Sequence, residues 1–191
     1  MKTSTRIFIL LLKITNPNPN LNINNLSGEG RFDLLSRVLT NVFFLGGGDF
    51  KFRTENELWM YFQSYGKKLV FKGNEIRGMN PDERSQAGIL KKVFSGEKIK
   101  GIEYSSAKWT EISRIFPNCI ILDETGYKFD ELDISSNIFL MGDHLGLTEE
   151  EKLYLSKHKS LSLGKRIYLS SQCVSIINYY LDQTHQDNLN T

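Results

Sequence analysis

Two stretches near the C-terminus limit most strongly the folds open to this 191-residue chain. Each is an apolar run that ends in a glycine-containing loop and leads into a helical pattern: NIFLMGDHLG at residues 137–146, and LSLGKRIY at residues 161–168. A third run of this kind covers residues 120–126. Glycine lets the backbone approach a ligand where a Cβ atom would collide. The pattern predicts half of a parallel α/β sheet, with a pocket for a small nucleoside at the strand ends.

Composition narrows the class of protein. Apolar residues make up 40% of the chain and charged residues 24%, which is ordinary for a globular domain with a sizeable core. The formal charge is only +2, so any nucleic-acid surface has to be a local patch. Cys119 and Cys173 form no CxxC motif and no cluster with the histidines. We therefore expect no metal site and a cytoplasmic, reducing environment.

The N-terminal third contains one strand, one loop and one helix. The apolar run at residues 7–14 is too short to span a bilayer and is interrupted by Lys13, so a buried strand is preferred to a signal sequence. The Asn/Pro-rich residues 15–27 predict an exposed loop, either a solvated connection or a substrate contact. Apolar pairs spaced by four predict a helix at residues 31–44, stopped by the glycines at 46–48.

The rest of the chain alternates between strand and helix patterns. Strands are expected at residues 58–62 and 68–71, joined through Tyr65 and Gly66. Asn80 is expected to cap a helix that continues to about Phe94. Residues 98–106 are interpreted as a basic, mobile connection, and residues 109–116 as a short helix. Further along, we predict a capping box at residues 148–151 and a last helix with an apolar stripe at Cys173, Ile176, Ile177, Tyr180 and Leu181.

These segments, together with GRFDLLSR at residues 30–37 and NPDER at 80–84, closely resemble the archaeal tRNA (pseudouridine-54 N1)-methyltransferase family of the SPOUT superfamily. The resemblance covers residues 5–182. It implies a single α/β domain over residues 1–191, with helices on both faces of a mainly parallel sheet and a C-terminal trefoil knot. Sequence rules alone predict an unknotted chain. Residues 183–191 are expected to be a flexible tail. The resemblance also implies a homodimer whose interface contains the last helix, although that helix's apolar stripe fits the protomer's own core equally well.

The resemblance implies S-adenosylmethionine as methyl donor. An adenine ring needs an apolar slot edged by backbone N–H and C=O groups, which glycine-containing loops supply. Cys173 is expected to contribute backbone and bulk rather than a thiolate. Lys165 and Arg166 are either solvated or meet RNA phosphates. His144, which follows Gly142 and Asp143, either helps to place RNA or is hydrogen-bonded to nearby backbone, and it is assigned no catalytic role. The residues expected to hold the cofactor are Leu122, Gly142, Leu163, Gly164, Lys165, Arg166, Ile167, Tyr168 and Cys173.

The implied acceptor is N1 of pseudouridine 54 in tRNA, a nitrogen that carries a free N–H because this nucleoside is joined to ribose through carbon. Arg31 and Asp33 are expected to bind the base, Asp33 by accepting the N1–H hydrogen bond and Arg31 through a carbonyl or phosphate. They resemble the Arg-Pro-Asp signature of ribosome-biogenesis pseudouridine methyltransferases, with Phe32 in place of proline. The plainer alternative is a surface salt bridge between Asp33 and Arg37. Arg84 either contacts RNA or pairs with the neighbouring acids.

Two other functions remain open at this point. One is a SPOUT methyltransferase with a different target, such as a ribose 2′-hydroxyl or another pseudouridine. The other is an RNA-binding assembly factor that uses the same fold without catalysis.

Overall fold

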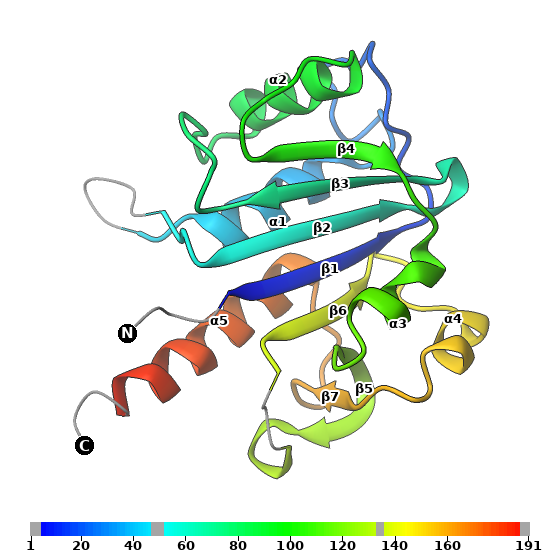
Figure 1. The fold of residues 1–191 in the computed structure, drawn as a ribbon, viewed down its shortest axis with the longest axis vertical. Coiled ribbons are helices and arrows are strands. Elements are labelled where there is room, and N and C mark those ends of the chain that lie inside the picture. The colour runs from blue at the N-terminus through cyan, green and yellow to red at the C-terminus, as the bar shows by residue number, and fades with distance from the viewer. Residues whose placement is uncertain (1–4, 47–51, 133–135, 188–191) are drawn as a thin grey trace.

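The computed structural model describes residues 5–46, 52–132 and 136–187. Figure 1 shows the elements in a ribbon view. In chain order they are β1 (Arg6–Leu12), α1 (Phe32–Phe43), β2 (Asn56–Phe62), η1 (Gln63–Tyr65), β3 (Lys67–Lys72), α2 (Glu83–Phe94), β4 (Ile102–Ser106), η2 (Trp109–Glu111), α3 (Ile112–Ile115), β5 (Ile120–Lys128), η3 (Phe129–Glu131), β6 (Ile138–Gly142), α4 (Glu149–Tyr154), β7 (Ser160–Ser162) and α5 (Ser170–Asp187).

The strands of the described residues form one seven-stranded sheet in the order β4-β3-β2-β1-β6-β5-β7 (Figure 1). β1 pairs in parallel with β2 and β6, and β5 pairs in parallel with β6 and β7. β3 is antiparallel to both β2 and β4, so it is the strand that runs against the rest of this sheet. The prediction of a mainly parallel α/β sheet is confirmed. The carboxyl ends of β1, β2, β5, β6 and β7 consequently point toward the same edge.

β1 occupies the middle of the sheet because its side chains are apolar on both faces. Phe8, Leu10 and Leu12 face one hydrophobic core, and Ile9 and Leu11 face the other, each at most 2% exposed. A strand covered on both sides reads as a continuous apolar run rather than an alternating one. The expectation of a buried first strand is confirmed for residues 7–12, whereas Lys13 and Ile14 lie beyond the strand and Ile14 is exposed.

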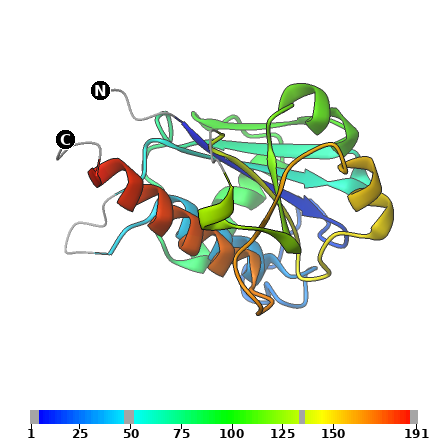
Figure 2. The ribbon, with the colours of Figure 1, turned by 90° about the horizontal axis from the view of Figure 1, so that it is seen from below.

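Helices cover both faces of the sheet. The first core contains residues of α1, α2 and α5, which lie behind the sheet in Figure 1. The second core contains Ile112 of α3 and Leu155, which follows α4, packed on Tyr61 and Leu140. Figure 2 shows α5 running along the outside of the first layer, beside α1. The predicted arrangement of helices on both faces is confirmed.

The expected mobile connection at residues 98–106 was wrong, because residues 102–106 form β4 at the sheet edge. Tyr104 is opposite Leu69, and Glu103 is opposite Val70 on the neighbouring strand. One face of β4 carries Ile102 toward the core, while the other carries Glu103, whose carboxylate pairs with Lys72. A short edge strand with polar and charged residues is hard to tell from a loop by composition.

Two helix boundaries also needed correction. α2 begins two residues later than expected: its N-cap is Asp82, which accepts a hydrogen bond from the Ser85 N–H at 2.8 Å, and not Asn80. Pro81 instead accepts a hydrogen bond from Thr40 of α1 at 3.0 Å. α1 ends at Phe43, before the glycines, of which Gly47 and Gly48 lie outside the described residues. The capping box at Thr148 and Glu151 is confirmed at the start of α4.

The C-terminal elements are longer than predicted. β5 continues through Gly126 to Lys128, where a loop was expected, because Gly126 packs directly on the β7 backbone: a Cβ there would lie 2.7 Å from the Leu161 nitrogen. α5 continues through Asp187, past the expected start of the tail at residue 183, and residues 188–191 lie outside the described residues. The trefoil knot stays a prediction.

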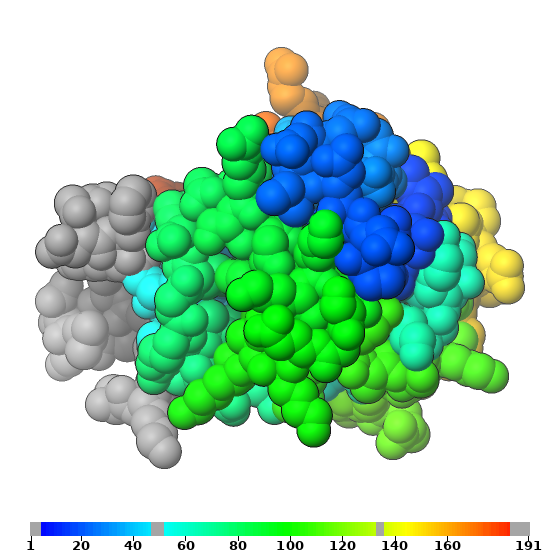
Figure 3. Space-filling model, turned by 90° about the horizontal axis from the view of Figure 1, so that it is seen from above, coloured from blue at the N-terminus to red at the C-terminus, as the bar shows by residue number. Residues whose placement is uncertain are grey.

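The apolar stripe of α5 differs from the expected one. Ile177 and Leu181 are buried as predicted, but the third buried apolar residue of this stripe is Val174, whereas Tyr180 is 38% exposed. Cys173 is partly buried against the same core. Residues 15–27 do form a loop, which is anchored by Leu21 and Leu26 in the core rather than fully solvated. In Figure 3 this blue connection lies next to the green of α2.

A charged network joins α5 to the amino ends of β1 and β2. Asp182 accepts hydrogen bonds from Arg6 at 2.7 Å and from Arg53 at 2.6 and 2.9 Å. Asn178, one turn earlier, accepts from Arg6 and from Asn56. Burial alone would raise the pKa of Asp182, but its hydrogen bonds with Arg53 and Arg6 outweigh that effect and hold it below the usual value. The network fixes the far end of α5 on the sheet.

We expect Asp182→Asn to lower the free energy of unfolding by about 2–3 kcal/mol, since it leaves the buried Arg6 guanidinium without a counter-charge and Arg53 with Glu55 alone. Because the folded-state pKa of Asp182 is lowered, its contribution is complete above about pH 4 and is lost as the pH falls through the folded-state value. Urea unfolding of both proteins at several pH values measures this difference, and exposed Glu97→Gln serves as control. A difference that grows on acidification would contradict the assignment.

Candidate functional site

A cleft of about 460 Å³ opens at the edge where the carboxyl ends of the parallel strands meet. Its walls come from residues 122–124 of β5, the loop that follows β6, Lys152 of α4, the loop between β7 and α5, and the first turn of α5. In Figure 2 this last loop is the orange segment that leads into α5. The volume is typical of a pocket for a small organic ligand or nucleotide-like cofactor.

Most residues predicted to hold the cofactor gather in this cleft. Lys165 is the exception: it lies in the same loop but outside the cleft lining, with its side chain exposed. The predicted cofactor-binding residues that line the cleft are Leu122, Gly142, Leu163, Gly164, Arg166, Ile167, Tyr168 and Cys173. That these residues bind the cofactor stays a prediction.

The loop after β6 is tight because two backbones touch. A Cβ on Gly142 would lie 2.5 Å from the carbonyl carbon and oxygen of Gly146, a distance that side chains do not adopt. The Gly142 carbonyl accepts a hydrogen bond from Ser170 Oγ at 2.8 Å, which connects this loop to the first turn of α5. Asp143 accepts a hydrogen bond from the Lys13 backbone N–H at 2.9 Å, which connects it to the end of β1. Gly142 is therefore required by the backbone itself.

The loop at residues 163–169 forms the opposite wall. Gly164 has a φ of +124°, a conformation that side chains strongly disfavour. The loop is closed at the start of α5, where Gln172 accepts a hydrogen bond from the Leu169 N–H at 2.9 Å. Ile167 is 83% exposed and Leu169 44%, so the outer surface of the loop presents apolar side chains beside the exposed Lys165 and Arg166.

Cys173 lies at the base of this wall as a neutral thiol. Burial raises the pKa of the Cys173 thiol to about 11, and its Sγ lies 3.8 Å from the Tyr168 carbonyl oxygen. A thiolate nucleophile would need a lowered pKa. The raised pKa argues against a thiolate role, and the contribution of bulk and backbone by Cys173 to cofactor binding stays a prediction.

Sequence reasoning missed two carboxylates that line the cleft, Asp123 and Glu124. Burial would raise the pKa of Asp123, but its hydrogen bonds with Thr125 and Lys152 outweigh this and lower it to about 2. Lys152 of α4 pairs with it at 2.9 Å. Within the described part of the chain, Glu124 makes no ion pair. Acidic residues immediately after a buried strand run were the available signal.

A second, narrower pocket adjoins the cleft and contains Arg31. It has room for about one water molecule, roughly 20 Å³, between the start of α1 and the end of β1. Asp143, His144, Leu169 and Ser170 line both pockets. Arg31, predicted for the acceptor site, and the residues predicted for the cofactor site therefore lie on two sides of a shared wall. Asp143 and His144, the latter assigned no catalytic role, belong to that wall.

Arg31 is held in an uncommon backbone conformation. Its φ of +66° makes it the only non-glycine residue with positive φ among those described, and it follows Gly30 at φ +87°. Such conformations cost about 1–3 kcal/mol and concentrate at functional sites. The guanidinium is aligned by two hydrogen bonds to Asp33, Nε to Oδ1 at 3.0 Å and Nη2 to Oδ2 at 3.2 Å.

Asp33 is an ionised carboxylate between two cations. The hydrogen bond from Arg31 is the largest influence that lowers the pKa of Asp33 below its usual value, and Arg37, which also donates to Asp33 Oδ2, adds to it. The salt bridge to Arg37 foreseen as the plainer alternative is therefore present. The pairing with Arg31 exists beside it, so the two interpretations of Asp33 are compatible.

Arg84 lies away from this constellation. It is exposed in the first turn of α2, whose amino end contacts Thr40, roughly 13 Å along α1 from Arg31. It makes no ion pair with the acids beside it or with any other described residue. Its predicted RNA contact stays a prediction.

The cleft suits a ligand with an apolar body and positive charge. Leu122, Met141 and Leu163 supply apolar wall, the glycine loops supply backbone groups, and Glu124 supplies a carboxylate. In the described ranges, no group of three or more His, Cys, Asp or Glu side chains could hold a metal ion. The helices of the described ranges are too short or too polar to cross a membrane.

Comparison with known proteins places this geometry in context. Residues 5–186 match a family model described as "Putative SAM-dependent RNA methyltransferase". Proteins named tRNA (pseudouridine(54)-N(1))-methyltransferase are similar over nearly the whole chain: 32% identity to that of Thermococcus kodakarensis and 31% to that of Pyrococcus abyssi, each over 93% of this chain and 98% of theirs. The protein of Methanococcoides burtonii is 31% identical over 84% of this chain and 88% of its own.

A solved structure shares the fold. The crystal structure of Archaeoglobus fulgidus Nep1 bound to S-adenosylhomocysteine superimposes with a TM-score of 0.65, at 14% identity, over 96% of this chain and all of that one. The expected SPOUT-type fold is confirmed by this likeness.

We expect Gly142→Ala to lower the free energy of unfolding by about 1–3 kcal/mol, because the added methyl group forces the loop off the Gly146 backbone. Gly88→Ala is the matched control, since Gly88 lies inside α2 and a methyl group added there would meet nothing within 4 Å. Alanine at that position should stabilise the protein by about 0.5–1 kcal/mol. Thermal and urea unfolding distinguish the two. Equal effects of the two substitutions would contradict the close backbone contact.

Proposed function

This chain belongs to the family of S-adenosylmethionine-dependent RNA methyltransferases, and we propose that it methylates N1 of pseudouridine 54 in tRNA. It is an enzyme with S-adenosylmethionine as methyl donor. The observation that carries the proposed target is the wall shared by the two pockets, which puts Arg31 next to the cleft for the donor. The relatives named for this modification supply the position of the nucleotide.

The residues of the large cleft fit the donor. Leu122 and Leu163 offer an apolar slot for the adenine, and backbone groups around Gly142 and the loop at 163–168 lie along its edge. Glu124 offers a carboxylate to a ligand that carries a positive sulfonium and an ammonium group. When bound, S-adenosylmethionine supplies an electrophilic methyl group. Because Cys173 stays a neutral thiol, no covalent step on this chain is invoked.

The acceptor base is bound by Arg31 and Asp33 in this proposal. Asp33 accepts the N1–H hydrogen bond of pseudouridine, while Arg31 holds a ring carbonyl or the adjacent phosphate. The lowered pKa of Asp33 makes it a poor base for an amide-like N–H. Its role is to orient the ring by accepting the N1–H hydrogen bond. The N1 proton is released to solvent as the methyl group is transferred, and proximity to the donor supplies much of the rate. The pocket at Arg31 holds about one water molecule, so binding of the base requires it to widen.

The active form is proposed to be a homodimer. The outer surface of the 163–169 loop and of α5 exposes large apolar residues: Ile167 at 83%, Leu169 at 44% and Tyr179 at 61%. Apolar exposure of this kind, concentrated beside a cleft, is typical of an interaction site. A second copy would cover it and complete the cofactor site. A purely monomeric species in sedimentation equilibrium at micromolar concentration would contradict this. We also propose a cytoplasmic location, in keeping with the free thiols of Cys119 and Cys173.

Two other functions are possible outcomes of the methylation experiment described below. A different target nucleotide would move the methyl group elsewhere in tRNA, and an assembly factor on this fold would bind RNA without methylating it. Neither is favoured by a specific observation, since this chain contributes both a cleft that fits the donor and the Arg31–Asp33 pair.

The target is tested with tRNA transcripts that carry either pseudouridine or uridine at position 54. The purified protein should transfer labelled methyl from S-adenosylmethionine to the pseudouridine transcript alone, because in uridine N1 is the glycosidic nitrogen and carries no proton. Nuclease digestion and mass spectrometry locate the label. Equal labelling of both transcripts contradicts the proposal, and labelling elsewhere supports the first rival.

Asp33→Asn should reduce the rate of methyl transfer at least tenfold while folding and S-adenosylmethionine affinity are retained, because the carboxylate that orients N1–H is replaced by an amide. A tenfold change corresponds to about 1.4 kcal/mol of transition-state stabilisation. Single-turnover rates and calorimetry of cofactor binding measure the two quantities.

Arg37→Gln is the control, since it removes the exposed salt bridge of Asp33 and leaves the pairing with Arg31. It should cost about 0.3–0.5 kcal/mol of stability and little rate. If both substitutions leave the rate unchanged, Asp33 is only a surface salt-bridge residue.

A further inference from the structure

A buried polar cluster lies outside the site on the face of the sheet that carries α3. His158, in the connection between α4 and β7, lies 2.9 Å from Ser113 Oγ of α3 through Nε2 and 3.4 Å from Cys119 Sγ through Nδ1. All three side chains are at most 9% exposed. The order Ser–His–Cys invites comparison with a hydrolytic triad.

This cluster of Ser113, Cys119 and His158, which we call the clasp, is structural and not catalytic. Burial raises the pKa of Cys119 to about 12, and burial together with the charge of Lys157 lowers the pKa of His158. The thiol and the imidazole are therefore both neutral near pH 7, and no reactant can reach them. What the clasp does is fasten α3 to the connection between α4 and β7.

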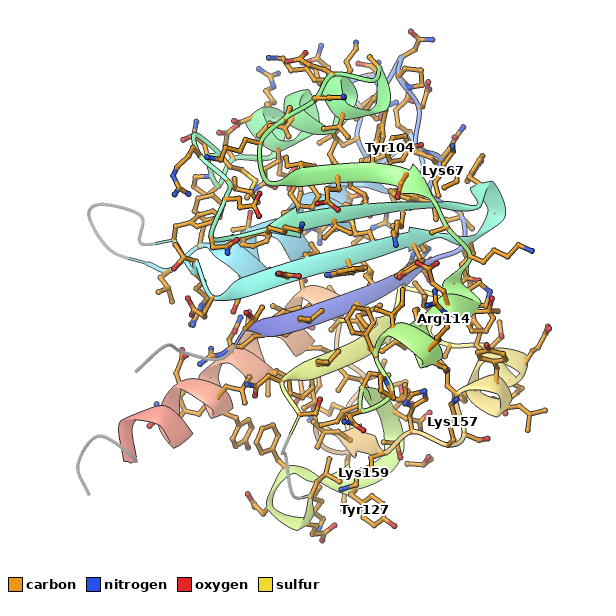
Figure 4. The ribbon with its side chains drawn as sticks, viewed as in Figure 1. Lys67, Tyr104, Arg114, Tyr127, Lys157 and Lys159 are labelled. Atoms are coloured by element: carbon orange, nitrogen blue, oxygen red, sulfur yellow. The ribbon has the colours of Figure 1, made fainter. Side chains whose placement is uncertain are left out.

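The residues next to the clasp are exposed cations. Arg114 follows Ser113, and Lys157 and Lys159 flank His158, so fastening the buried side chains holds the three cations on one surface. They make no ion pair with any residue in the described ranges. In Figure 4 they descend along one side of the molecule, from α3 to the start of β7.

Nearby acidic groups are already occupied. Glu111, just before α3, accepts hydrogen bonds from Lys68 at 2.8 Å and from Tyr61 at 3.1 Å. Asp123 is paired with Lys152. The three cations thus remain available to an external anion.

An exposed aromatic ring extends this surface. Tyr127 of β5 is 60% exposed and lies opposite Leu161 in register, two residues beyond Lys159. Figure 4 shows it at the lower end of the same row. Cations that bind phosphates, interleaved with aromatic rings on which bases stack, are the usual composition of a surface for single-stranded nucleic acid.

We propose that Arg114, Lys157, Lys159 and Tyr127 form a platform that binds the tRNA backbone while the target base enters the site. The inference rests on the proposed function for the identity of the RNA. Lys157 and Lys159 belong to the connection between α4 and β7, and the elements at both ends of this connection contribute to the cofactor cleft, through Lys152 of α4 and Leu161 of β7. The platform therefore adjoins the cleft along the chain, on the face of the sheet that carries α3. The small net charge of the chain agrees with a local patch of this kind.

The test compares two triple variants with equal loss of charge. Arg114→Gln/Lys157→Gln/Lys159→Gln should weaken binding of a tRNA transcript on the order of tenfold at a fixed salt concentration, because three phosphate contacts disappear. The slope of log affinity against log salt should become shallower by about 2–3, at 0.7–0.9 for each phosphate contact. Lys91→Gln/Lys92→Gln/Lys98→Gln, which neutralises exposed cations at and beyond the end of α2, is the control and should leave the slope near the wild-type value.

Tyr127→Ala separates stacking from charge. It should weaken binding about fivefold or more, without changing the salt slope. S-adenosylmethionine affinity and the melting temperature, measured on every variant, should match the wild type.

If the Arg114/Lys157/Lys159 variant binds tRNA with the affinity and salt slope of the wild type, the platform is overturned. It is also overturned if the control variant weakens tRNA binding as much as the platform variant does. A wild-type enzyme that binds tRNA through these residues but does not methylate pseudouridine 54 overturns the proposed function and leaves the platform standing. If the platform variant binds tRNA normally but no longer binds a protein partner, the platform is overturned as an RNA surface.

Discussion

The site depends on one close contact between backbones at the end of β6. Gly142 packs against Gly146 at a distance that leaves no space for a Cβ, and the Gly142 carbonyl is bound by Ser170 at the start of α5. This contact brings the C-terminal helix onto the strand ends and creates the cleft between them. It also fixes Asp143, whose carboxylate holds the end of β1. Both pockets use the wall that results.

The charged side chains at the proposed acceptor site, Arg31 and Asp33, are placed to orient a base. Arg31 is fixed by a left-handed backbone and by two hydrogen bonds to Asp33, so it presents a guanidinium in a defined direction. Its partner is ionised at neutral pH. Such a pair can align a base that offers an N–H and a carbonyl, but it cannot remove a weakly acidic proton efficiently. The rate must come mainly from placing the reacting atoms together.

Sequence predicted the parts of this molecule whose signal is local. Local patterns predicted β1 from its continuous apolar run, α1 from its four-residue spacing, and the capping box of Thr148 and Glu151. The family resemblance located eight residues that line one cleft. The edge strand β4 was missed because tertiary pairing with β3, not its own composition, makes it a strand. Asp82 replaced Asn80 as cap because Pro81 is bound to α1.

Other features depend on distant segments meeting, so no local pattern contains them. Lys152 of α4 pairs with Asp123 of β5 beside the cleft, and Ser113 contacts His158, which is 45 residues away in sequence. The pocket at Arg31 likewise brings residues 10–38 together with residues 143–171. The cations around the clasp became interpretable only when the structure placed them on one surface.

The central claim is that the cleft at the strand ends binds a cationic methyl-donor nucleoside. Isothermal titration calorimetry of the purified protein with S-adenosylmethionine tests it most directly. The account predicts saturable binding with a dissociation constant below about 1 mM, weakened by Gly142→Ala. Absence of binding at millimolar ligand by a folded protein would contradict it.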